Sequence, residues 1–146
     1  CRGELIEDDP PVLLDAAHNP AGTEALAALL AERGRDWQII LAVRKDRDPE
    51  ELVRALAPVA AGFWLPRMQG ETLRPAEELA AAVDRAAPAA MVAVASTARC
   101  LQQARREAGK GGIVLTGSQH ALGEWLRQGV VRSPRLLQRL GLPAGT

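Results

Sequence analysis

The chain has 146 residues, 47% of them hydrophobic, and no formal net charge, because 18 Lys and Arg balance 18 Asp and Glu. That balance gives no indication of a nucleic-acid partner or an anionic membrane surface, and no apolar stretch approaches the ~20 residues of a membrane span. A chain of this length and hydrophobic content is expected to form one domain, residues 1–146, with a core of its own.

The two cysteines, Cys1 and Cys100, form neither a disulfide framework nor a metal-ligand spacing. Together with only two histidines they supply no zinc site, so we expect no metal ligands in this chain. Reduced thiols and the lack of a visible signal peptide favour a cytoplasmic protein. The chain opens on Cys1 rather than Met and enters strand-like sequence within about ten residues, so we expect it to be a piece of a longer polypeptide.

Strand and helix patterns alternate along the chain. The predicted strands are 3–6, 12–14, 37–43, 62–65, 89–95 and 111–116. The predicted helices are 21–33, 49–57, 75–87, 97–108 and 121–128. This alternation predicts βαβ units, and therefore a three-layer, Rossmann-like α/β sandwich with a mostly parallel six-stranded sheet and helices on both faces. Residues 130–146 carry three leucines at helical spacing and are expected to form one more helix or a frayed tail.

The first candidate site follows the strand at 12–14. Asp15, His18 and Asn19 come after that apolar run and directly before a long Ala/Leu-rich helix that begins near Pro20. In open α/β sheets ligands bind beyond the carboxyl ends of the strands, and a helix N-terminus favours anions. The alternative is that Asp15 caps the helix and His18 is merely exposed in a turn.

Two further polar loops stand at predicted strand ends. Asp46-Arg47-Asp48 follows the strand at 37–43, and we expect it to lie beside the first site in the sheet; the alternative is a solvated turn that caps the next helix. Gly117-Ser118 follows the strand at 111–116, where Gly117 allows a tight turn and Ser118 is a suitable cap for the last helix.

Several motifs that would complete a catalytic machinery are absent. The sequence has no Gly-x-x-x-x-Gly-Lys-Ser/Thr phosphate loop and no Gly-x-Gly-x-x-Gly after the strand at 12–14. It offers one candidate base with no nucleophile beside it, which argues against a self-contained hydrolase. The chain therefore has parts of a site and lacks the whole.

Taken in order, the three loops resemble the C-terminal domain of the folylpolyglutamate synthase/dihydrofolate synthase family of the Mur ligase superfamily. Asp15-Ala16-Ala17-His18-Asn19-Pro20 matches the family's Asp-Gly-Ala-His-Asn-Pro at all but its second position. Asp46-Arg47-Asp48 stands for its Asp-Lys-Asp, and Gly117-Ser118 for its Gly-Ser. Arg2 stands where the family has an arginine about a dozen residues before the Asp, and the likeness extends to about Gln128.

The resemblance implies an ATP-dependent ligase that joins L-glutamate to a folate through an acyl phosphate. It implies that ATP and Mg²⁺ are held mainly by a larger N-terminal P-loop domain of the same polypeptide, so that this domain is inactive alone. ATP contacts are implied for Arg2, Asp15, Asn19, Asp46 and Arg47. His18, Asp15 and Ser118 are implied to be catalytic, near the reacting phosphate or the incoming glutamate.

Two other functions stay open at this point. One is a sister Mur-type ligase that acts on a peptidoglycan precursor and shares the fold and a similar Asp-x-x-His loop. The other is a stand-alone nucleotide-binding or regulatory domain, against which the missing glycine-rich fingerprint counts.

Overall fold

The structure is a computed structural model that describes residues 3–6, 10–34, 36–109, 111–130, 132, 138, 141 and 143. Its strands are β1 (Glu4–Ile6), β2 (Val12–Leu14), β3 (Trp37–Leu41), β4 (Ala60–Arg67), β5 (Met91–Ser96) and β6 (Gly112–Thr116). Its helices are α1 (Pro20–Glu32), α2 (Pro49–Leu56), the short 3-10 helix η1 (Ala57–Val59), α3 (Ala76–Ala86), α4 (Thr97–Ala108) and α5 (Gln119–Arg127). Every predicted element among the described residues is present with shifts of a few residues at its ends. The predicted helix or tail at 130–146 falls mostly outside the described residues.

The six strands form one sheet in the order β1-β2-β6-β3-β4-β5. β1 runs antiparallel to β2, and every other neighbouring pair is parallel. The predicted mostly parallel, six-stranded sheet is therefore confirmed. No helix in the described residues is long and apolar enough to cross a membrane.

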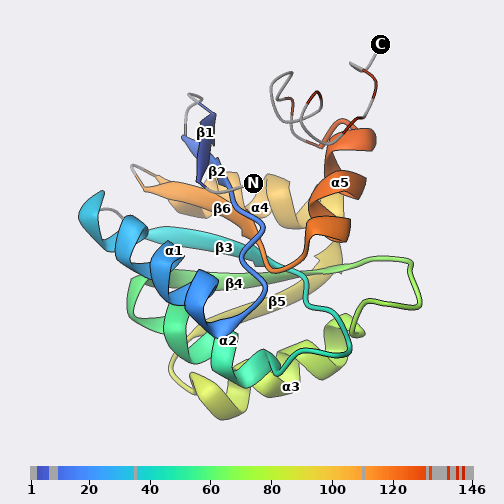
Figure 1. Ribbon diagram of the computed structural model, residues 1–146. Coiled ribbons are helices and arrows are strands. Elements are labelled where there is room, and N and C mark those ends of the chain that lie inside the picture. Colours follow the sequence, from blue (N-terminus) through green and yellow to red (C-terminus); the bar gives the residue numbers. More distant parts are fainter. Residues whose placement is uncertain are drawn as a thin grey trace.

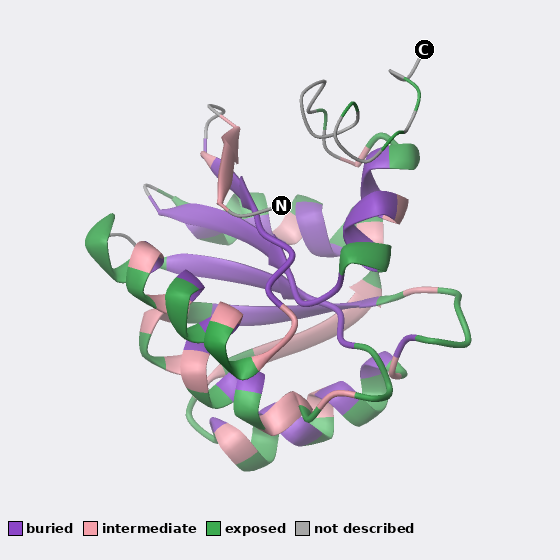
Figure 2. Ribbon diagram, viewed as in Figure 1, coloured by how far each residue is buried: buried purple, intermediate pink, exposed green. Residues whose placement is uncertain are grey.

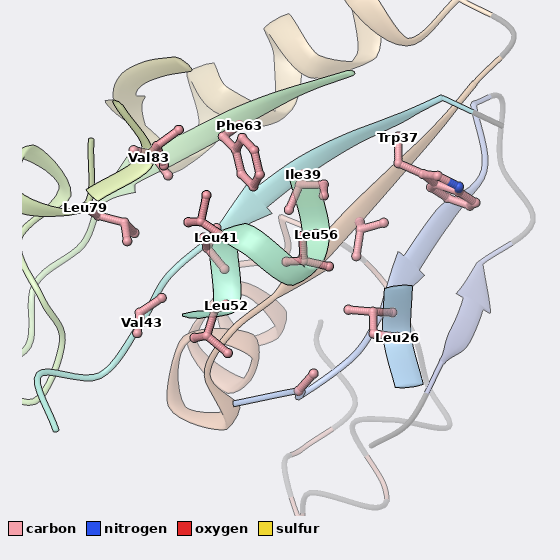
Figure 3. Close-up of a cluster of buried hydrophobic side chains, with 14 of the residues drawn as sticks. Leu26, Trp37, Ile39, Leu41, Val43, Leu52, Leu56, Phe63, Leu79 and Val83 are labelled. Atoms are coloured by element: carbon pink, nitrogen blue, oxygen red, sulfur yellow. The ribbon is translucent and has the colours of Figure 1, made fainter. Parts of the chain in front are cut away.

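Helices cover both faces of this sheet (Figure 1). α1, α2 and α3 pack on one face over an apolar cluster that includes Leu26, Trp37, Ile39, Leu56 and Phe63, all of them at most 2% exposed (Figure 3). α4 and α5 pack on the other face over a second apolar cluster. The three-layer sandwich is confirmed.

The central strands owe their unbroken apolar character to this double cover. Both faces of β2, β3 and β6 are buried, whereas the residues of the edge strands β1 and β5 are at best half-buried (Figure 2). In a parallel sheet with helices on both sides neither face meets water, so successive residues are apolar instead of alternating. Residues 113–115 of β6 are the clearest example. β3 contains one buried polar residue, Gln38, whose Oε1 accepts the indole N–H of Trp64 at 2.8 Å.

The carboxyl ends of the parallel strands meet at one edge of the sheet, where the loops β2–α1, β6–α5, β3–α2 and β4–α3 gather (Figure 1). β6 ties two of them together at backbone level. The Asp15 N–H donates to the carbonyl of Leu115 at 3.1 Å, and the Ala42 N–H donates to the carbonyl of Thr116 at 3.2 Å. This edge carries all three motifs that the sequence singles out within the described residues.

Candidate functional site

Asp15 is buried, with 6% of its surface exposed, and its carboxylate is held by backbone donors. Oδ1 accepts the N–H of Ala17 at 2.8 Å, and Oδ2 accepts the N–H of Gly3 at 2.8 Å. The second bond fastens the start of β1 to the end of β2. Asp15 does not cap α1, so the alternative interpretation of this residue as a helix cap is wrong.

Asn19 caps α1 in its place. Its Oδ1 accepts the N–H of Gly22 at 2.8 Å, and its backbone carbonyl accepts both the hydroxyl and the N–H of Thr23. An extended backbone at Asn19 followed by Pro20 at the first helical position is the usual start of a helix. The cap uses one lone pair of the amide oxygen of Asn19 and leaves the NH₂ donors and the second lone pair for other partners.

His18 is half-buried, and its Nδ1 lies 2.9 Å from the carbonyl oxygen of Ala16. Because a carbonyl oxygen only accepts, Nδ1 carries the proton in this contact. In the neutral ring Nε2 is therefore the atom with the free lone pair. The contact fixes the tautomer and gives His18 a hydrogen-bond acceptor beside the cleft described below.

Ala16 takes the place of the glycine in the motif without strain. Among the described residues every positive φ belongs to a glycine, so the backbone of Ala16 lies in a region open to any residue. Ala16 is 8% exposed and packs into the cluster beneath α4 and α5. The loop therefore accommodates its methyl group.

The β6–α5 turn has the two properties predicted for it. Gly117 has φ of 106°, and a Cβ atom there would lie 2.2 Å from the carbonyl oxygen of Ala42, so only glycine fits. Ser118 caps α5, and its Oγ accepts the N–H of Ala121 at 3.3 Å. Ser118 is fully buried in this domain, so capping is the role that its environment shows.

The β3–α2 loop is more exposed. Asp48 caps α2 by accepting the N–H of Glu50 at 2.9 Å, and Asp46 pairs with Arg44 at 3.0 Å. Arg47 is half-buried, and its side chain makes no hydrogen bond or ion pair with any residue that the structure describes; its Nε is shielded from solvent and has no acceptor. Its guanidinium therefore keeps donors for an anion, which is the chemistry that arginine serves best.

The expectation that this loop lies beside the β2–α1 loop is wrong. β6 lies between β2 and β3, so the β6–α5 turn with Gly117 and Ser118 is the neighbour of both. After β2 and α1 the chain re-enters the sheet as β3, two positions away from β2. β6 later fills the position between β2 and β3. The three motifs occupy three consecutive strand ends, with β2 and β3 roughly 9–10 Å apart.

A cleft of about 480 Å³ opens at the first of these strand ends. It extends along α1 from Asp15, Ala17, His18 and Asn19 to Arg33, with Gln119 of α5 on its wall. Its far part is lined by small and apolar residues of α1, among them Ala25 and Leu29. Of the predicted residues, the structure brings Asp15, His18 and Asn19 together here; Ser118, Asp46 and Arg47 do not line this cleft. Arg2 lies outside the described residues.

The described residues contain no group of side chains arranged as a metal site. Within the described ranges no three His, Cys, Asp or Glu side chains are grouped closely enough to hold a metal ion.

The sequence gives no signal for one residue that the structure adds to this edge. Arg74, in the β4–α3 loop, donates from Nη2 to the carbonyl oxygens of Lys45 and Arg47 at 2.8 and 2.9 Å. These partners lie 29 and 27 positions away in the sequence. An arginine before Pro75 at the start of a helix has no local pattern that predicts such a contact.

The fold and the three strand-end loops define a Rossmann-like α/β domain with polar loops gathered at one edge of its sheet. Residues 1–120 match the model of the family described as Mur ligase, glutamate ligase domain. The chain belongs to this family.

Two curated relatives are dihydrofolate synthase/folylpolyglutamate synthases. The chain is 34% identical over 73 residues to that of Bacillus subtilis and 43% identical over 61 residues to that of Mycobacterium tuberculosis. These matches cover 45% and 40% of this chain, but only 17% and 12% of the relatives.

Solved structures give a longer match. The structure of M. tuberculosis folylpolyglutamate synthase complexed with ADP and AMPPCP is 31% identical, with a TM-score of 0.79, over 91% of this chain and 32% of that one. The bifunctional folylpolyglutamate synthase/dihydrofolate synthase of Yersinia pestis shares the fold at 19% identity, with a TM-score of 0.74 over 89% of this chain and 31% of that one. The chain thus matches about a third of the length of these enzymes.

Proposed function

We propose that this chain is the C-terminal domain of an ATP-dependent ligase that adds L-glutamate to a folate or dihydropteroate. The observation that carries the proposal is the meeting of three polar loops at consecutive ends of β2, β6 and β3, in a chain that belongs to the glutamate ligase domain family. The relatives named above are folate enzymes, which favours a folate over a peptidoglycan precursor.

In this proposal the domain binds and aligns the substrates. Formation and attack of an acyl phosphate depend mainly on such alignment and on stabilisation of charge. The N-terminus of α1 and the unpaired guanidinium of Arg47 stabilise negative charge on phosphate oxygens. His18 presents Nε2 as an acceptor at the cleft, suited to the ammonium group or the proton of the incoming glutamate. Asp15 acts first of all by holding the loop from which His18 projects.

The other parts of the proposed enzyme lie elsewhere. A P-loop domain of the same polypeptide, N-terminal to this one, would hold most of ATP and the Mg²⁺, since the described residues offer no cluster of metal ligands. In this proposal ATP contacts this domain at two places. One is the cleft beside α1, and the other is the guanidinium of Arg47, whose donors no described residue occupies. Magnesium would supply charge neutralisation of the phosphates when bound.

The test is ligation by the longer polypeptide that carries this domain. We expect ADP release that depends on glutamate with dihydropteroate as the acceptor, and none with a nucleotide-sugar peptide. His18→Ala should lower turnover about a hundredfold or more without changing thermal stability, since the ring has a single backbone contact.

The matched control is His120→Ala, which alters the other histidine, an exposed residue that does not line the cleft. We expect its turnover to stay within a few-fold of the unaltered enzyme. Full turnover in folded His18→Ala would refute the role of His18, and ligation to the nucleotide-sugar peptide would refute the folate substrate.

A further inference from the structure

The β3–α2 and β4–α3 loops, at the edge where the parallel strands end, are joined by a short backbone ladder. The Arg74 N–H donates to the carbonyl of Val43 at 2.8 Å, and the Lys45 N–H donates to the carbonyl of Thr72 at 2.9 Å. Arg44 and Leu73 form the antiparallel bridge between these bonds. The β4–α3 loop therefore runs alongside the β3–α2 loop and is in a position to set its shape.

The side chain of Arg74 extends this ladder beyond its last backbone bond. Its Nη2 donates to the carbonyls of Lys45 and Arg47, so it holds the peptide group before Asp46 and the peptide group after Arg47. The side chain is only 22% exposed, and its second terminal nitrogen, Nη1, lies 3.6 Å from Glu78 at the start of α3. A guanidinium in this place satisfies two carbonyls that no element of regular structure reaches.

One backbone bond also holds this part of the loop, since the Arg47 N–H donates to the carbonyl of Arg44 at 3.2 Å. Arg44, Lys45 and Asp46 are exposed, and the ion pair between Arg44 and Asp46 is a surface pair, which contributes little. Arg47 has no side-chain partner among the described residues. The two carbonyl bonds to Arg74 therefore act together with this turn bond to set the direction in which Asp46 and Arg47 project.

We propose that Arg74 is a positioning residue of the ligase: it fixes the Asp46-Arg47 segment in the orientation that ligand binding needs, without touching a ligand itself. This inference rests on the proposed function, because it assigns Arg74 to the same site. Loss of such alignment lowers the rate of an otherwise intact enzyme, since a displacement of about 1 Å at a positioned group is costly.

The test compares Arg74→Met with Arg67→Met in the longer polypeptide. Methionine keeps an unbranched stem and removes the donors. Arg67 is the matched control: it lies at the end of β4, its side chain is 61% exposed, and among the described residues it forms a hydrogen bond and ion pair with Glu77 alone, at 2.8 Å. We expect Arg74→Met to lower kcat/KM for ATP and glutamate about tenfold, and to leave the KM of the folate within twofold. Arg67→Met should leave all three within twofold.

Two more measurements separate positioning from general damage to the fold. Amide hydrogen exchange at 44–48 should be faster in Arg74→Met than in Arg67→Met, with β3 and β6 unchanged. Arg74→Lys, which keeps the charge and one terminal donor group, should recover about threefold of the lost kcat/KM.

The inference is overturned if Arg74→Met has the kinetics of Arg67→Met. It is also overturned if Arg74→Met raises the KM of the folate by as large a factor as it lowers kcat/KM for ATP and glutamate, and Arg74→Lys recovers none of the lost activity. It is also overturned if exchange at 44–48 does not change. Failure of the proposed function has a different signature, the lack of glutamate-dependent ADP release in the unaltered enzyme.

Discussion

Replacing Asp15 by alanine removes both acceptors of the Ala17 and Gly3 N–H groups. A hydrogen bond to a charged group contributes about 1.5–3 kcal/mol to stability. The bond to Ala17 is buried, whereas the bond to Gly3 is half-buried, where water replaces part of the loss. We therefore expect Asp15→Ala to lower the free energy of unfolding by about 3 kcal/mol, or about 6–12 °C in Tm for a domain of this size.

Asp15→Asn separates the two bonds. The asparagine amide keeps one acceptor oxygen but turns a donor NH₂ toward the second N–H, so we expect about half of that loss. Activity of the full ligase should fall in Asp15→Ala together with stability, whereas His18→Ala loses activity alone.

Urea denaturation followed by fluorescence of the three tryptophans measures this difference. The matched control is Asp46→Ala, which removes an exposed aspartate with one surface ion pair and should change the free energy of unfolding by less than about 0.5 kcal/mol. Equal stability of Asp15→Ala and Asp46→Ala would refute the structural role of the Asp15 carboxylate.

Two further predictions concern the core around the site. Gly117→Ala should destabilise the domain by about 2 kcal/mol or more, because the new methyl group meets the carbonyl of Ala42 and the backbone φ is 106°. The control is Gly123→Ala in α5, where a Cβ would meet no neighbouring group of the described residues within 4 Å; equal urea midpoints would contradict the argument. Burial raises the pKa of the Cys100 thiol to about 11, so the unfolded state loses its thiol proton at lower pH than the folded state, and stability should fall as the pH rises from about 9 to 11. In Cys100→Ala this part of the fall in Tm should vanish, and an identical pH profile would disprove it.

The sequence by itself determines the elements and the local chemistry of the motifs. The mostly apolar run from Trp37 predicts a strand buried on both faces, because helices cover both sides of such a strand and exclude water. Asn19-Pro20 and Gly117-Ser118 predict a capped helix start and a tight turn, since the atoms involved lie within four residues of one another. Their order along the chain is sufficient to indicate the family.

Only the tertiary structure decides which of these elements are neighbours. β6 separates β2 from β3, although 70 residues lie between β3 and β6 in the sequence, and no local pattern encodes which gap a later strand fills. The same holds for the hydrogen bonds that shape the site: Asp15 meets Gly3 12 positions away, and Arg74 meets Arg47 27 positions away. Such contacts depend on how the crossover helices pack the strands together, and that is a property of the whole sheet.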